Sequence, residues 1–303
     1  MPVPVLFGWT KKNSEPIPNF CVRYVRTVSA GQRSAYHLAM IAQTLFLCTA
    51  AFFAGAINSI AGGGTLLTFP ALTWILGSSA VAAVTANATS TVALFPGSIA
   101  AIWGYRREMK GLGRWILPLI IPSIIGSVIG TWLVVTQPEQ IFQEMVPWLI
   151  LVAATLFLLQ PAITKWTGIG KPHAQPSRST LVGIIVFQMG IALYGGYFGA
   201  GIGILMLSSL ALMGLGDIHQ MNALKSVLAS AINGTAVFMF IANRRVDWQY
   251  AVPMIVAGIA GGFVGASVSR RLDKNVVRWT VIAIGFGLAT YYFTRVYLPS
   301  RAG

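Results

Sequence analysis

Charged side chains are scarce in this 303-residue chain. Only 9% of its residues are Asp, Glu, Lys or Arg, whereas soluble globular proteins carry about 25%. Hydrophobic residues make up 55% of the chain. This composition lacks the polar surface of a soluble fold and the polarity of a disordered chain. It predicts an all-α integral membrane protein with most of its length inside a bilayer.

Acidic residues and cysteines are also few. The chain has 7 Asp and Glu against 21 Lys and Arg, which gives a net charge of +14. The bases lie in short loops between apolar runs rather than on a basic and aromatic face, so they indicate membrane topology and no nucleic-acid partner. The two cysteines, Cys21 and Cys48, make no disulfide framework.

Motifs of enzymes and metal sites are missing. The triplet Gly62-Gly63-Gly64 is not followed by the Gly-Lys-Ser/Thr of a Walker loop, and neither His-Glu-x-x-His nor Cys-x-x-Cys occurs. No acidic residue lies in the middle of an apolar run, which argues against a cation pump or a channel lined by carboxylates. We expect no metal, no other cofactor and no catalytic residue, so the chain is predicted not to be an enzyme.

The apolar runs divide the chain into two membrane halves. We expect a polar cytosolic tail over 1–37, membrane repeat 1 over 38–160, a polar linker over 161–179, membrane repeat 2 over 180–298 and a C-terminal tail over 299–303. Full spans are predicted at about 38–60, 79–103, 115–135, 146–160, 180–198, 218–241, 250–268 and 276–297. Two further apolar pieces, 65–76 and 204–215, reach only about 18 Å and predict broken or re-entrant helices.

An internal repeat supports this division. The pattern Pro-x7-Gly-x3-Gly begins at Pro118 and again 135 positions later at Pro253. The runs 61–64 and 200–203 share the pattern Ala-Gly-x-Gly at an offset of 139. A duplicated unit with a broken segment in each half is typical of secondary transporters. We interpret the glycines of the Pro-x7-Gly-x3-Gly pattern as helix-packing positions.

The loop charges leave two topologies open. With four full spans per half and the short pieces re-entrant, 16 of the 21 bases lie on the cytosolic side and four lie outside. With ten spans, 9 bases lie on the cytosolic side and 11 lie outside. The positive-inside rule favours the first arrangement, which makes the halves parallel repeats with both termini cytosolic. Five plus five inverted spans are the alternative.

The two glycine-rich turns are the first candidate site. Each precedes a short helix whose unpaired N-terminal N–H groups carry a partial positive charge that suits a small anion. Asn58 precedes the first turn and Thr65 follows it. Tight helix packing is the competing explanation, because Gly195, Gly199 and Gly203 are spaced four apart.

Lys225 is the most informative single residue, because a charge within a span is costly and marks a functional position. Its alternative role is to extend its charge to the membrane surface. Asn87 occupies the comparable part of the first half, and Asn233 lies farther along the Lys225 segment. Buried amides either bind an oxyanion or join two helices. Tyr194 and Tyr197 flank the second turn and offer hydroxyl donors, although interface anchoring is an equal alternative.

At these residues the sequence resembles the sulfite exporter TauE/SafE family. The resemblance rests on the run Ala54-Gly55-Ala56-Ile57-Asn58-Ser59-Ile60-Ala61-Gly62-Gly63-Gly64, on Ala86-Asn87, on Tyr194-Gly195-Gly196-Tyr197-Phe198-Gly199-Ala200-Gly201-Ile202-Gly203, and on Lys225 with Asn233. It covers about 38–297. The resemblance implies export of sulfite or small organosulfur anions across the bacterial cytoplasmic membrane.

We therefore expect a secondary transporter of a small sulfur oxyanion, working by alternating access between the two repeats, with an anion channel as the alternative. The expected partners are the small anion and the lipid bilayer, with a homo-oligomer left open. The predicted substrate-binding residues are Asn58, Gly62, Gly63, Gly64, Thr65, Asn87, Tyr194, Tyr197, Gly199, Gly201, Gly203, Lys225 and Asn233.

Overall fold

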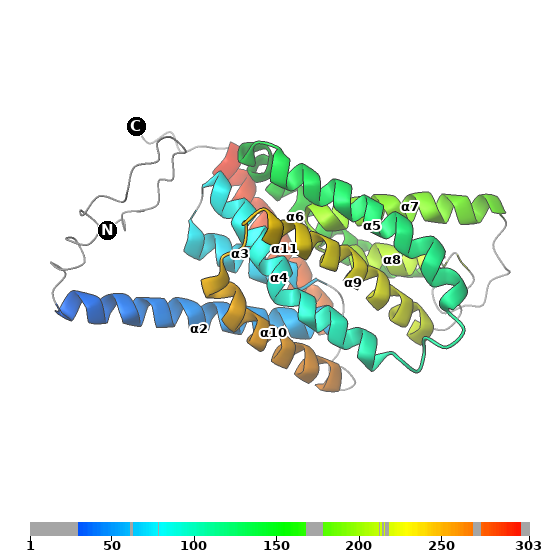
Figure 1. Ribbon diagram of the computed structural model, residues 1–303, viewed down its shortest axis with the longest axis horizontal. Coiled ribbons are helices and arrows are strands. Elements are labelled where there is room, and N and C mark those ends of the chain that lie inside the picture. The colour runs from blue at the N-terminus through cyan, green and yellow to red at the C-terminus, as the bar shows by residue number, and fades with distance from the viewer. Residues whose placement is uncertain are drawn as a thin grey trace. The chain divides into compact units, whose positions relative to one another are not determined.

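A computed structural model describes residues 30–60, 63–77, 79–167, 178–211, 213, 215, 218–268 and 274–297. Over these ranges the regular secondary structure is entirely helical (Figure 1). The contacts divide the chain into two compact units, residues 1–43 and residues 44–303. The second unit contains the helices that carry the candidate site.

The described helices agree closely with the predicted apolar runs. They are α2 (Ala30–Ile60), α3 (Thr65–Leu76), α4 (Ala80–Gly104), α5 (Gly113–Thr136), α6 (Glu139–Thr167), α7 (Arg178–Tyr197), α8 (Ile202–Ala211), α9 (Ile218–Ala242), α10 (Trp248–Val268) and α11 (Lys274–Tyr297). The start of α4 has a local cause, because the Ser79 hydroxyl accepts a hydrogen bond of 3.1 Å from the Ala82 N–H and caps the helix.

Seven described helices are long and apolar enough to cross a membrane: α2, α4, α5, α6, α7, α9 and α10. Two others, α3 and α8, are apolar but have only 12 and 10 residues. Several large apolar side chains on the long helices are exposed, among them Trp103, Phe238 and Phe263. Lipid is the environment that such side chains require, so the chain is a multi-pass membrane protein.

Several helix boundaries differ from the sequence predictions. α2 begins at Ala30, before the predicted start at 38, and α6 begins at Glu139, before the predicted start at 146. α6 continues through Pro161 to Thr167, into the stretch predicted as polar linker. A span predicted from hydropathy stops where the apolar residues stop, whereas the helix continues into polar residues. α8 begins at Ile202 rather than Ile204 and ends at Ala211, before the predicted limit at Leu215.

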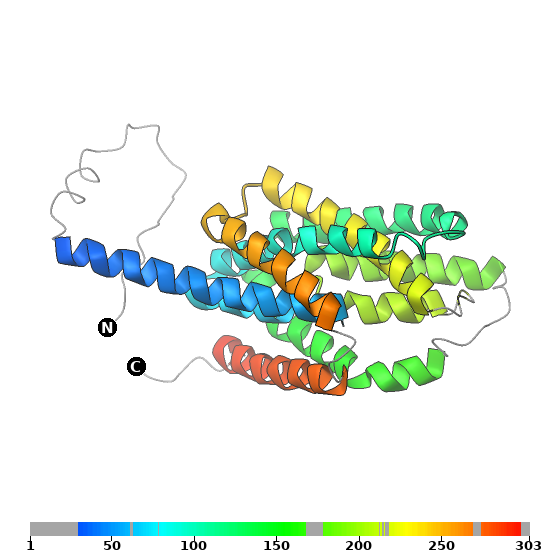
Figure 2. The same ribbon diagram turned by 90° about the horizontal axis from the view of Figure 1, so that it is seen from below.

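Small residues bring the long helices into close contact. A Cβ atom added to Gly126 or Gly130 of α5 would overlap the backbone of α7. A Cβ on Gly261 of α10 would overlap the backbone of α2 at Phe52. These glycines occupy helix interfaces, as the sequence predicts for their pattern, and allow backbones to approach closely. α6 and α11 also pack against each other (Figure 2).

Candidate functional site

The first glycine turn lies between α2 and α3. Gly63 and Gly64 are buried, whereas Gly62 falls outside the described residues. The N–H groups of Leu67 and Thr68 donate to the Gly64 carbonyl at 3.0 and 3.3 Å, so α3 begins at this turn. A Cβ on Gly64 would lie 3.3 Å from the Asn58 Cβ. The structure therefore places Asn58 directly beside the turn, and Thr65 is the first residue of α3.

The second glycine turn joins α7 to α8. Gly199 and Gly201 have φ angles of +83° and +78°, a backbone conformation that residues with a Cβ rarely adopt. The Tyr194 hydroxyl donates to the Ala200 carbonyl at 2.8 Å. Tyr194 therefore holds the turn from inside, instead of anchoring the chain at the membrane surface. Gly203 is the second residue of α8 and is buried.

Both turns pack against the same stretch of α6. A Cβ on Gly63 would lie 2.5 Å from the Phe157 ring, and a Cβ on Gly201 would lie 3.6 Å from the Ala153 Cα. Ala153 and Phe157 are one helical turn apart and fully buried. The two breaks in the helices, 139 positions apart in sequence, therefore meet at one place in the fold.

Polar side chains of α4 connect the two turns. The Asn87 side-chain Nδ2 donates to the Tyr197 carbonyl at 3.1 Å, at the end of α7. One turn further along α4, the hydroxyls of Ser90 and Thr68 share a hydrogen bond of 2.5 Å. Thr68 belongs to the first turns of α3. Thr68 and Ser90 were not predicted, although the run Asn87-Ala88-Thr89-Ser90-Thr91 is unusually polar for a membrane span.

Tyr197 links the second turn to the corner between α5 and α6. Its hydroxyl accepts a hydrogen bond of 2.6 Å from the Gln137 side-chain amide. Its ring packs against Phe142 with the centroids 5.5 Å apart. Tyr197 therefore takes part in the site region through its carbonyl, hydroxyl and ring, and Gln137 is a contact that the sequence did not predict.

The predicted residues of α9 occupy a different position. The Lys225 Nζ donates to the Asn222 Oδ1 at 2.9 Å, and the Lys225 side chain is half-buried. Asn233 is also half-buried. Its neighbour Ile232 packs against α7 one helical turn before the second glycine turn, because a Cβ on Gly195 would lie 2.9 Å from the Ile232 side chain. Among the described residues, the Lys225 ammonium is paired with its own helix rather than with either turn.

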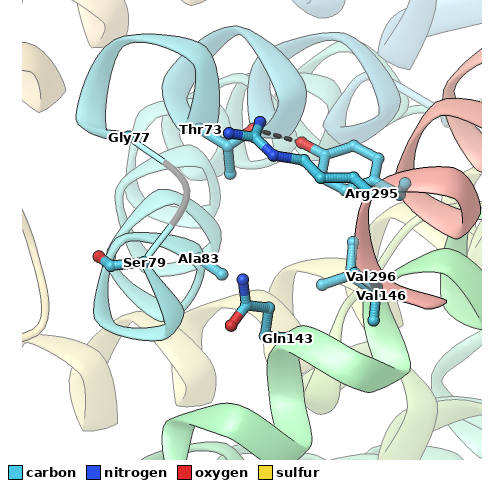
Figure 3. Close-up of a pocket in the computed structure, with 9 residues that line it drawn as sticks. Thr73, Gly77, Ser79, Ala83, Gln143, Val146, Arg295 and Val296 are labelled. Carbon is cyan, nitrogen blue, oxygen red and sulfur yellow. Dashed lines mark hydrogen bonds between the residues drawn. The ribbon is translucent and has the colours of Figure 1, made fainter. Parts of the chain in front are cut away.

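A small cavity of about 30 Å³ lies near the ends of α3 and α11 (Figure 3). Its polar lining comes from Arg295, Gln143, Ser79 and a hydrogen-bonded hydroxyl pair, Thr73 with Tyr292. The Arg295 Nη1 also donates to the Tyr291 hydroxyl at 2.7 Å. Within the described ranges, no three His, Cys, Asp or Glu side chains gather into a group that could hold a metal ion.

Comparisons with known proteins identify the family. A probable membrane transporter protein of Haemophilus influenzae is 27% identical over 78% of this chain and 88% of its own length. ORF9 of a Sinorhizobium species is 28% identical over 85% of this chain and 93% of its own length. YfcA of Escherichia coli K12 is 29% identical over 77% of this chain and 83% of its own length. Both bear the name probable membrane transporter protein. No solved structure matches the chain. Residues 47–292 match the sulfite exporter TauE/SafE family, and the chain belongs to this family of membrane transporters.

Proposed function

We propose that the protein is a secondary transporter that exports a small sulfur oxyanion, sulfite or an organosulfonate, across the bacterial cytoplasmic membrane. The observation that carries this proposal is the meeting of the two glycine turns at Ala153 and Phe157 of α6. Backbone that leaves a helix at membrane depth is tolerated where it is buried in protein or lines a cavity. Two broken helices that meet inside a duplicated fold are the usual position of a transporter substrate site.

The chemistry of the region favours an anion. α3 and α8 both begin at the turns, so the positive ends of two helix dipoles lie next to them. Lys225 adds a cation within the α9 span. These groups and the family membership support an oxyanion, and we propose Asn58, Asn87 and Lys225 among its ligands. Gly62, Gly63, Gly64, Thr65, Tyr194, Tyr197, Gly199, Gly201, Gly203 and Asn233 complete the proposed site.

We also propose that the two halves are inverted repeats of five segments each, in place of the four-plus-four arrangement that the loop charges favour. Gly234 of α9 faces Phe95 of α4, and the later residue Asp247 donates its N–H to the earlier residue Thr89. α4 and α9 therefore run antiparallel, which corresponding helices of parallel repeats would not do. The two helices run in opposite directions in Figure 1.

The helix contacts support the duplication itself, whereas the inversion rests on the antiparallel directions of α4 and α9. In a duplicated fold, α2 to α6 correspond in order to α7 to α11. The contact of α5 with α9 then corresponds to that of α10 with α4. The contact of α3 with α4 corresponds to that of α8 with α9. Contacts of α6 with α8 and of α11 with α3 correspond likewise. An axis in the membrane plane that relates the halves is the geometry of alternating access in many transporters. Ten segments also leave both termini on one side, which we propose is the cytosol.

The membrane potential is sufficient to drive export. An anion that leaves a negative-inside cell gains about 2.3 kcal/mol per charge per 100 mV. Since the sequence carries no Walker motif, the proposed mechanism needs no nucleotide. One repeat rocks against the other around the bound anion, and the potential sets the direction of net flux.

Counterflow tests the proposal. The full chain is reconstituted into liposomes that are loaded with unlabelled sulfite, and uptake of labelled sulfite from outside is followed. Saturable uptake that exceeds the level in unloaded liposomes is the expected result. Flux that does not saturate and shows no counterflow would identify an anion channel instead. Exchange of organic cations or neutral sugars in place of sulfite would overturn the proposed substrate class.

A further inference from the structure

We propose that the Asn87 Oδ1 accepts a hydrogen bond from the transported anion, so that the site selects oxyanions that carry their own O–H or N–H group. This inference rests on the proposed function and narrows its substrate class. Hydrogensulfite, a hydroxysulfonate and an aminosulfonate all belong to that class. Sulfite without its proton and simple alkylsulfonates do not.

The orientation of the Asn87 amide is determined by its partner. The Tyr197 carbonyl can only accept a hydrogen bond, so the group 3.1 Å from it must be the Nδ2 donor. This partner distinguishes the two ends of the amide, which otherwise look alike. The other end of the amide is therefore the acceptor Oδ1.

Within the described ranges, this acceptor is buried and unpaired. The Asn87 residue is 1% exposed, and its Oδ1 has no hydrogen-bond partner among the residues that the structure describes. Buried polar atoms of native proteins are paired with protein, with ordered water or with a ligand. An unpaired acceptor needs a donor, which a fully deprotonated oxyanion does not have.

The position of Asn87 favours the ligand as this donor. The same amide is bonded to the last residue of α7, where the chain enters the second glycine turn. Ser90, one turn away on α4, is bonded to Thr68 beside the first glycine turn. The unpaired oxygen therefore belongs to the short stretch of α4 that bridges the two turns of the proposed substrate site.

Lys225 occupies the position of the second half that corresponds to Asn87. Asn87 is the eighth residue of the 25-residue helix α4, and Lys225 is the eighth residue of the 25-residue helix α9. Corresponding positions of the two halves thus present an acceptor and a cation. Because α4 and α9 run antiparallel and contact each other at Phe95 and Gly234, Asn87 and Lys225 lie toward opposite ends of this helix pair. The inference therefore rests on Asn87 and its own surroundings.

Gln188 offers a matched control. Its Nε2 donates to the Ser123 hydroxyl at 2.9 Å, and its Oε1 is buried without a partner in the described structure. It therefore repeats the pattern of Asn87, but between α7 and α5, nine positions before the end of α7. If the buried amide oxygen of Asn87 had no role in binding the ligand, substitution of Asn87 and of Gln188 would have the same effect on ligand preference.

The test compares two sulfonates that differ in one hydroxyl. Ethanesulfonate and 2-hydroxyethanesulfonate compete with labelled sulfite in the counterflow assay with the full chain. We expect the hydroxylated compound to inhibit at a concentration at least about 10-fold lower, because a site with an unpaired acceptor discriminates against the ligand that lacks the donor. Asn87→Leu should abolish this preference, and Gln188→Met should keep it.

Each outcome decides between the alternatives. Equal inhibition by the two sulfonates in the wild-type protein, or no inhibition by either while sulfite still exchanges, would overturn the inference and leave the transporter proposal standing. A preference that survives in folded Asn87→Leu would assign the donor to another acceptor. Asn87→Ala replaces Asn87→Leu if the latter does not fold, and the wild-type comparison needs no variant. Failure of sulfite to exchange at all would contradict the proposed function itself.

Discussion

Glu139 and Arg245 form an ion pair of 2.9 Å that joins the first residue of α6 to the loop between α9 and α10. Two residues earlier, Gln137 is bonded to the Tyr197 hydroxyl at 2.6 Å. The corner between α5 and α6 is therefore tied to the second half of the chain at two points. A rocking movement that separates this corner from the second half must break both contacts.

Neutralising the ion pair should change transport only modestly. Both side chains are about one quarter exposed, at 26% and 27%, and such pairs contribute about 0–1 kcal/mol. We expect Glu139→Gln to shift the transport rate by no more than about fivefold, which corresponds to about 1 kcal/mol. The exchange variant Glu139→Arg with Arg245→Glu should return the rate toward the wild-type value. A loss of more than tenfold that the exchange does not restore would show another role for the carboxylate.

Two glycines of α7 should respond oppositely to alanine. A Cβ on Gly196 would lie 2.8 Å from the Ser127 Cα, whereas a Cβ on Gly190 meets no atom within 4 Å. We expect Gly196→Ala to destabilise the protein by about 1–3 kcal/mol through overpacking. Gly190→Ala should be neutral or stabilising, because alanine favours the helix by about 1 kcal/mol. Thermal denaturation in detergent measures the stability of both variants. Equal denaturation midpoints would contradict the close contact of α7 with α5 at Gly196.

Gly201→Ala tests the second glycine turn through backbone strain. The space at Gly201 accepts a Cβ, since the closest atom would lie at 3.6 Å, but its φ angle is +78°. Alanine in this conformation costs about 1–2 kcal/mol, so the turn should shift away from α6. We expect a lower denaturation temperature together with slower sulfite counterflow. Gly287→Ala, in an open position of α11, is the control that should leave both unchanged.

Lys225→Met should reduce sulfite counterflow at least about tenfold, because a partly buried cation next to an anion contributes more than about 1.4 kcal/mol. Lys225→Arg keeps the charge and should retain part of the activity. Lys110→Met removes an exposed lysine of the loop before α5 and should have no effect. Wild-type counterflow in a folded Lys225→Met protein would exclude Lys225 as the counter-charge.

Local features of the sequence predicted most of the helices. The apolar runs located every described helix of the membrane halves, and the glycines placed the start of α3 at Thr65. Boundaries were predicted less well where a helix continues past its apolar part, as α6 does through Pro161 to Thr167. Helix length there depends on backbone hydrogen bonds and neighbouring helices, which hydropathy does not measure.

The candidate site was predicted only in part. Asn58 and the described glycines lie at the turns, and Asn87 and Tyr197 meet through a hydrogen bond. Phe157, Thr68 and Gln137 escaped prediction, because a phenylalanine in an apolar run and a polar residue near a helix end have no distinctive pattern. Their importance comes from partners that are distant in sequence, such as Ser90 for Thr68 and Tyr197 for Gln137.

Composition, periodic apolar runs and the repeated glycine pattern determined that this chain is a helical membrane protein with two broken helices, because hydrophobic burial and the conformational freedom of glycine act locally along the chain. Only the tertiary structure decided that the two breaks meet at Ala153 and Phe157. The tertiary structure also buries the Asn87 Oδ1 without a partner among the described residues and pairs Lys225 with Asn222. Contacts between distant segments depend on how whole helices pack, and no short stretch of sequence contains that information.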